Sequence, residues 1–206
     1  MKTLPMLSGL ALSLGLAVAG AAFAQSPPPA AVEATIGKLA LTNLPAQGGA
    51  ELTVASPAFG DMQDIPFENT QYRGNRFPGL SWSAGPASTK TYAVIMQDTD
   101  ANRGGNPILH WTMYNIPAST TSLPAGMTDV VAGAYGPNMR SPDNPYVGPK
   151  PPAGPKHRYH IQIFALDAAI APAPMTYDEL TAAMKGHVVA SGQLIGLGQF
   201  DPNAPK

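Results

Sequence analysis

Side chains able to carry acid–base or anion-binding chemistry occur in three short segments of the chain. These are Asp98-Thr99-Asp100, His110-Trp111, and the stretch from Gly148 to Tyr159, which includes Pro151, His157 and Arg158. Each segment lies at or beside the end of a strand-like run, where loops can gather acids, imidazoles and a guanidinium into one pocket. This set of groups predicts a pocket for a small anion.

Several of these residues also have a purely structural explanation. His110 lies within an apolar strand run, so it could be a core histidine that is hydrogen-bonded to a neighbour. Asp98 and Asp100 end a strand, where either could form an Asx-type turn. His157 follows a loop rich in proline and glycine and precedes an arginine, which favours contact with a ligand. His160 is expected to be a surface or packing residue.

The segments that must position these residues are typical of a loop-rich β protein. The 23 prolines and 21 glycines fall between apolar runs of the 206-residue chain. Alternating or β-branched runs predict strands at 52–55, 80–83, 91–97, 109–116, 159–166 and 188–194, with an earlier strand around 36–44. One helix is predicted at 176–185, because Thr176 and Glu179 have the spacing of a capping box and Gly186 follows.

The N-terminus has the pattern of an export signal. Lys2 precedes an apolar stretch at 10–22, and Ala22-Phe23-Ala24 places small residues where a signal peptidase cleaves. An uncleaved membrane anchor is the alternative, but the stretch is short of the roughly 20 apolar residues that span a bilayer. We therefore expect a signal peptide at 1–24, a Pro/Ala/Gly-rich segment at 25–50 that acts mainly as a tether, one domain at 51–206, and a periplasmic or secreted protein.

The composition excludes several classes of function. The chain has no cysteine, so disulfide and thiol chemistry are absent. Charged residues make up 12% of the chain and the net charge is −1, which predicts no binding to nucleic acid. No segment after the signal is long and apolar enough to span a bilayer, which predicts no stable membrane insertion after signal cleavage. No serine or cysteine nucleophile motif and no metal signature such as His-Glu-x-x-His occurs, so no metal and no cofactor are expected.

The order of the motifs resembles that of a known family. Asn75-Arg76-Phe77-Pro78-Gly79-Leu80-Ser81-Trp82, Asp98-Thr99-Asp100-Ala101, His110-Trp111, Pro151-Pro152-x-Gly154 and His157-Arg158-Tyr159 occur in the order found in the phosphatidylethanolamine-binding protein (PEBP) family, in its bacterial, Raf-kinase-inhibitor-like branch. The resemblance covers residues 51–199. It implies a mainly β, sandwich-like fold of two antiparallel sheets with a short C-terminal helix and an anion pocket at one end.

The resemblance also implies roles for single residues. Asp98 matches the first acid of the family's Asp-Pro-Asp-Ala-Pro segment, and His110 matches its buried histidine. His157 and Tyr159 match its Gly-x-His-Arg-Tyr segment. Asp100 and Arg158 would stand behind these ligand-binding groups, and Pro151 would lie beside them.

The chain departs from the family pattern at three places in these motifs. Thr99 and Asn102 stand where the family has prolines, and Lys156 separates a glycine–proline pair from His157. These differences leave the shape of the loops and the selectivity for a ligand open.

The chemistry of such a pocket is coherent. A nearby carboxylate raises the pKa of a histidine and so favours its protonated, donor-only form. His110 and His157 could then hold a phosphate oxygen, as in a phosphomonoester or a phosphoryl headgroup. Tyr159 could add a hydroxyl donor, and Pro151 with Pro152 could form a rigid apolar wall.

Three kinds of function are compatible with this reading. The first is an exported, non-catalytic protein that binds phosphorylated small molecules or phospholipid headgroups. The second is an inhibitor of a protease or kinase that acts through surface loops such as 141–155. The third is an enzyme acting on a small molecule, in which Asp98 with His110 or His157 serves as general acid and base.

Overall fold

The computed structural model describes residues 30–135, 146–171 and 176–205. The predicted export signal at 1–24 lies outside these residues. So do residues 141–145 of the loop that could inhibit a protein target.

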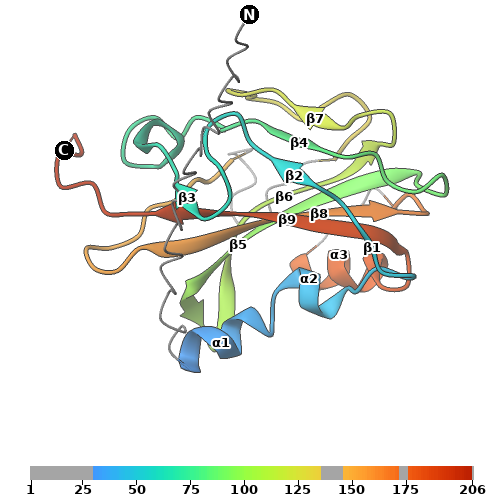
Figure 1. Cartoon of the computed structure of the whole chain (residues 1–206), viewed down its shortest axis with the longest axis horizontal. Helices are drawn as coiled ribbons and strands as arrows, with labels where there is room; N and C mark the ends of the chain where they lie inside the picture. The colour runs from blue at the N-terminus through green and yellow to red at the C-terminus, as the bar shows by residue number, and fades with distance from the viewer. Residues whose placement is uncertain (1–29, 136–145, 172–175, 206) are drawn as a thin grey trace, which may run out of the picture.

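Two β-sheets form the centre of the molecule (Figure 1). The larger sheet has the strand order β1-β9-β8-β5-β6, with β3 also paired to β9, and the smaller sheet has the order β2-β4-β7. The long strands of the larger sheet are β5 (Thr91–Arg103), β6 (Asn106–Pro117), β8 (His157–Leu166) and β9 (Val188–Gly198). They pair antiparallel. The short strands β1 (Ala50–Glu51) and β3 (Gln63–Asp64) add parallel pairings to β9.

The smaller sheet and the helices lie on opposite faces of the larger sheet (Figure 1). The smaller sheet consists of β2 (Val54–Ala55), β4 (Leu80–Trp82) and β7 (Ser122–Leu123), all paired antiparallel. The opposite face carries α1 (Ala30–Ile36), α2 (Ala40–Asn43) and α3 (Tyr177–Met184). A 3₁₀ turn, Phe67–Asn69, lies in the connection between β3 and β4. The architecture is therefore the two-sheet, mainly β fold that the sequence predicts.

Strand β5 is buried on both faces and separates two hydrophobic cores. Tyr92, Val94 and Met96 pack between the two sheets. Ala93 and Ile95, which alternate with them, pack against the helices. Successive side chains of a strand point to opposite faces, so a strand covered on both sides is apolar at every position. This explains the continuous apolar run in the sequence, and the three central strands predicted at 91–97, 109–116 and 159–166 are confirmed.

The strand predicted around 36–44 is wrong, because these residues belong to α1, a turn and α2. Leu39, Ala40 and Leu44 are buried at a helical spacing. The backbone N–H of Ala40 donates to Gln97 Oε1 at 2.9 Å, and that of Leu41 donates to Gln162 Oε1 at 2.7 Å. Buried glutamines of the sheet therefore satisfy the first turn of α2, so the described part of the 25–50 segment packs against the sheet and is not a tether.

The predicted helix at 176–185 is confirmed as α3. Thr176 Oγ1 accepts a hydrogen bond from the Glu179 backbone, and the Glu179 carboxylate accepts one from the Thr176 backbone at 2.8 Å, which completes the capping box. Of the strand predicted at 52–55, only residues 54–55 form a strand, β2. Residues 52–53 connect it to β1, which belongs to the other sheet.

The hairpin of β5 and β6 extends six residues further along β5 than the apolar run predicts, to Arg103. Its turn contains Gly104 and Gly105 at φ of 62° and 77°, the left-handed conformations that a tight hairpin turn requires. The ladder is interrupted between Asp98 and Asn102, where residues 99–101 bulge out. The Asp98-Thr99-Asp100 segment therefore lies inside a long hairpin.

Candidate functional site

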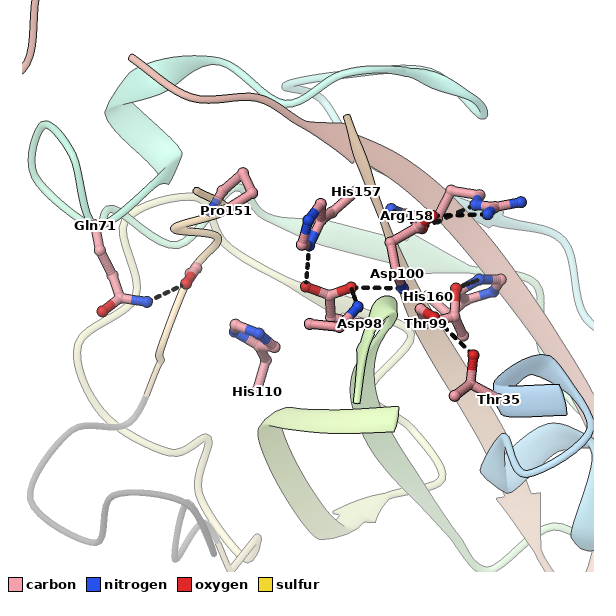
Figure 2. A network of polar contacts seen from close by, with 12 residues as sticks. Thr35, Gln71, Asp98, Thr99, Asp100, His110, Pro151, His157, Arg158 and His160 are labelled. Atoms are coloured by element: carbon pink, nitrogen blue, oxygen red, sulfur yellow. Dashed lines mark hydrogen bonds and ion pairs between the residues drawn. The ribbon is translucent and has the colours of Figure 1, made fainter. Parts of the chain in front are cut away.

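The carboxylate of Asp98 organises the candidate site. Its Oδ1 accepts hydrogen bonds from the backbone N–H groups of Asp100 at 2.9 Å and Ala101 at 3.0 Å. Its Oδ2 accepts from Nδ1 of His157 at 2.9 Å (Figure 2). The Asp98 side chain is only 3% exposed. Asp98 thus forms the local turn and also orients His157, and its role in ligand binding stays a prediction.

His157 is held in a form that favours a positive charge. The hydrogen bond to Asp98 raises its pKa above the ordinary value for histidine, burial opposes this, and the charges of Asp98 and Asp100 add to the increase. Because Nδ1 donates to Asp98, the second ring nitrogen is the one available to a ligand. The side chain is 13% exposed. Below its raised pKa, His157 is therefore a partly buried cation that can donate to an anion.

A β-bulge brings His110 to the same side of the sheet. Met96 pairs with Trp111 and Gln97 pairs with Leu109, so His110 is an extra residue in the ladder. Such a bulge redirects a side chain and is common beside functional sites. The His110 ring then packs edge-to-face on Tyr159, with centroids 5.0 Å apart.

The orientation of the His110 ring is fixed by a backbone carbonyl. Nδ1 of His110 donates to the carbonyl of Val147 at 3.0 Å, and His110 is 4% exposed. A carbonyl can only accept, so Nδ1 of His110 carries a proton. The histidine is at once a buried core residue and a member of the site.

The loop that supplies this carbonyl, residues 146–151, is held by side chains that the sequence analysis did not identify as site residues. Asn75 donates to the Tyr146 carbonyl at 2.6 Å and accepts from the Gly148 N–H at 2.7 Å. Gln71 donates to the Gly148 carbonyl at 2.5 Å, and the Tyr72 hydroxyl donates to the Pro151 carbonyl. Residues 71–75 therefore position the 146–151 loop. A side-chain bond to a remote carbonyl leaves no signal in a single sequence.

Tyr159 lies between the two imidazoles. Its ring is edge-to-face to His110 and stacked with His157 at a centroid distance of 6.5 Å. It is 1% exposed and packs on Gly198, where an added Cβ would come within 2.5 Å of the ring. Tyr159 fixes the spacing of the two histidines. Its predicted role as a hydroxyl donor stays a prediction.

Asp100 and Arg158 pair with each other behind these groups. Arg158 donates to Asp100 through Nε at 2.9 Å, through a terminal nitrogen at 2.7 Å and through its backbone N–H at 2.7 Å. Burial raises the pKa of Asp100, but these hydrogen bonds outweigh it and leave the pKa below its usual value. The hydrogen bond to Asp100 likewise raises the pKa of Arg158. The pair braces the bulge, and its guanidinium is already engaged by a carboxylate.

Pro151 completes the cluster on the side of the loop. It is buried, whereas Pro152 is exposed, so only the first of the two prolines can serve as the predicted apolar wall. Figure 2 shows Pro151, His157, Asp98 and His110 arranged around one region of the molecule, with Gln71 beside the loop. A protonated imidazole, a second fixed imidazole and an apolar wall suit a small anion with an apolar or neutral remainder.

The described residues also limit other chemistry at this place. Within residues 30–135, 146–171 and 176–205, no group of three or more histidines, cysteines, aspartates or glutamates is arranged to hold a metal ion. Asp98 and His157 have the geometry of an acid that orients a general base.

Comparison with known proteins identifies the family. The family model described as phosphatidylethanolamine-binding protein matches residues 55–199. A UPF0098 protein of Methanothermobacter thermautotrophicus is 33% identical over 150 residues, which cover 71% of this chain and 97% of that protein. A solved structure of a PEBP homologue from Chlamydia trachomatis matches with 29% identity and a TM-score of 0.66, and covers 73% of this chain and 99% of that one. The chain belongs to the phosphatidylethanolamine-binding protein family.

One relative bears on the location of the protein in the cell. LppC of Mycobacterium tuberculosis, which is named as a lipoprotein, is 32% identical over 197 residues, or 94% of each chain. In the part of the chain that the structure describes, no helix is long and apolar enough to cross a membrane. Both observations are compatible with an exported protein.

Proposed function

We propose that the protein is an exported binding protein for phosphorylated small molecules or phospholipid headgroups. The observation that carries the proposal is the hydrogen bond between Asp98 and His157, beside His110. It favours an imidazolium in a partly buried position, where a charged donor interacts more strongly with an anion than it would in water. Membership in a family described as phosphatidylethanolamine-binding supports the same ligand class.

The proposal is tested by calorimetric titration of inorganic phosphate and of phosphoethanolamine into the protein at pH 6. Binding of both is expected, with phosphoethanolamine tighter if Pro151 contacts the organic part. Sulfate at the same concentration tests whether the site prefers phosphate among oxyanions. If neither phosphate nor phosphoethanolamine binds at millimolar concentration, the proposal is wrong.

A second candidate function, an enzyme acting on phosphoesters, is favoured by the same Asp98–His157 pair, because an aspartate-oriented histidine is a common general base. Following a phosphoester library by ³¹P NMR in the presence of the protein separates the two functions. Release of phosphate that is lost in His157→Ala would assign an enzyme. Binding without product supports a binding protein.

Export is part of the proposal and has its own test. The pattern around Ala22-Phe23-Ala24 predicts a mature N-terminus at Gln25. N-terminal sequencing of protein recovered from the periplasm or the medium should begin at Gln25. Recovered protein that still begins at Met1 would contradict cleavage.

A further inference from the structure

A second hollow lies behind the candidate site, on the helix-covered side of the larger sheet. It has a volume of about 200 Å³ and is bounded by the α1–α2 turn, the start of α3 and the β5–β6 hairpin. Gln97 and Leu109 contribute to its wall and are paired across β5 and β6. The next residues along the two strands are Asp98 and His110, and side chains alternate between faces. The same pair of strands therefore carries the candidate site on one face and this hollow on the other.

The hollow contains a hydrogen-bond donor that is held in place. Both ends of the Gln97 amide are engaged: Oε1 accepts from the Ala40 N–H at 2.9 Å and from Gln162 Nε2 at 3.0 Å, and Nε2 donates to the Tyr177 hydroxyl oxygen at 3.0 Å. Among the described residues, none accepts the hydroxyl proton of Tyr177. Burial raises the pKa of Tyr177 to about 12. Tyr177 therefore keeps its proton and can donate it to a ligand.

Two exposed charges of opposite sign line the hollow, those of Lys38 and Asp178. Neither side chain forms an ion pair or hydrogen bond with another residue of the described part of the chain. The Lys38 ammonium lies over the β5–β6 turn, since a Cβ added at Gly105 would be 3.4 Å from Nζ. The apolar part of the lining comes from Leu109 and Pro107.

We propose that this hollow binds a small zwitterion with an apolar body, that is, an apolar α-amino acid. Its carboxylate is matched by Lys38 and the Tyr177 hydroxyl, and its ammonium group by Asp178. Its side chain is matched by Leu109 and Pro107. A volume of about 200 Å³ admits a molecule of this size but not a segment of protein chain. The proposal does not rest on the anion site, because none of these residues belongs to that site.

The test is a calorimetric or NMR titration with L-leucine and with two analogues that each lack one charge, 4-methylpentanoic acid and 3-methylbutylamine. Leucine should bind more tightly than either analogue. Lys38→Met should weaken leucine about three- to fivefold and Asp178→Asn by a similar factor, as expected for exposed charge pairs. Both positions are exposed, so both variants should fold.

The controls separate this site from the anion site. Lys90→Met removes an exposed lysine at the other end of β5 and should leave leucine binding unchanged. Phosphate binding should be the same in Lys38→Met as in the wild type, and saturating phosphate should not displace leucine. Absence of leucine binding at millimolar concentration, or equal binding by wild type, Lys38→Met and Asp178→Asn, would overturn the proposal.

Discussion

Replacing His157 with alanine should weaken phosphate binding about ten- to a hundredfold at pH 6. At that pH the raised pKa keeps the imidazole protonated, so the variant loses one charged hydrogen bond to the ligand. Such a bond contributes roughly 1.5 to 3 kcal/mol, which corresponds to about one to two powers of ten in the dissociation constant. Calorimetric titration of inorganic phosphate into both proteins measures the ratio directly.

His187 offers a matched control. It also donates to an aspartate, with Nδ1 of His187 2.8 Å from Oδ1 of Asp167, but its side chain is 49% exposed. It precedes β9, whose first residue, Val188, pairs with Leu166 at the end of β8 opposite His157. His187→Ala removes the same chemical group from a similar pair and should leave phosphate binding unchanged.

The pH dependence gives a further check on the same reasoning. A histidine whose pKa is higher in the folded protein stabilises the fold fully below its unfolded pKa, near 6.5. This contribution is lost as the pH rises through the folded pKa. The difference in unfolding free energy between wild type and His157→Ala should therefore be largest below about pH 6.5 and shrink above it.

The binding experiment has its own refuting outcome. If His157→Ala binds phosphate as tightly as the wild type does, His157 is not the charged donor of the site.

Three further predictions follow from the contacts around the site. Asp98→Asn should make phosphate binding fade at a lower pH than in the wild type, because the amide no longer raises the pKa of His157; titration from pH 5 to 8 measures this. Asn75→Gly keeps the left-handed backbone (φ 52°) but frees the 146–151 loop, so phosphate binding should fall severalfold by calorimetry. Gln162→Leu should lower the unfolding free energy by about 1 to 3 kcal/mol in urea, because the Leu41 backbone N–H loses its acceptor and the buried Gln97 Oε1 loses a donor. An unchanged pH profile, unchanged affinity and unchanged stability, respectively, would contradict them.

The central strands could be predicted because a strand that is buried on both faces needs apolar residues, and these are visible in the sequence. Residues Tyr92 to Met96 of β5 are apolar and all buried, so this apolar stretch is uninterrupted. The polar half of β5 could not be predicted in this way. It is a strand because it pairs with β6 across the Gly104-Gly105 turn, as Asn102 does with Pro107 and Arg103 with Asn106, and this pairing is a tertiary contact.

The error at 36–44 has a similar cause. Leu39, Ala40, Leu41 and Leu44 fit either a short strand or a short helix by composition alone. The helix is favoured over a strand by Gln97 and Gln162, which supply acceptors to two backbone N–H groups at the start of α2. These glutamines lie about 60 and 120 residues away in the sequence. Isolated helices this short are not stable in water, so tertiary packing decides the outcome.

The site was predictable in its charged members but not in its geometry. The acid and the two histidines are conspicuous because their residue types carry the chemistry. Nothing in the sequence indicates that His110 occupies a bulge, or that the Val147 carbonyl fixes its ring. Every residue carries a backbone carbonyl, so the sequence does not indicate which carbonyl accepts a hydrogen bond from a side chain.

The two buried faces of β8 also explain how one strand can hold two histidines in different states. His157 faces the smaller sheet, where hydrogen bonding to Asp98 raises its pKa. His160 faces the helices, and burial lowers its pKa, while Thr99 Oγ1 and Gln193 Oε1 satisfy its ring nitrogens at 3.1 and 3.0 Å. As the pH falls, His157 gains its proton first. His160 stays neutral over that interval, so β8 can gain charge on the side of the candidate site while the hydrogen bonds of His160 on the other side stay in place.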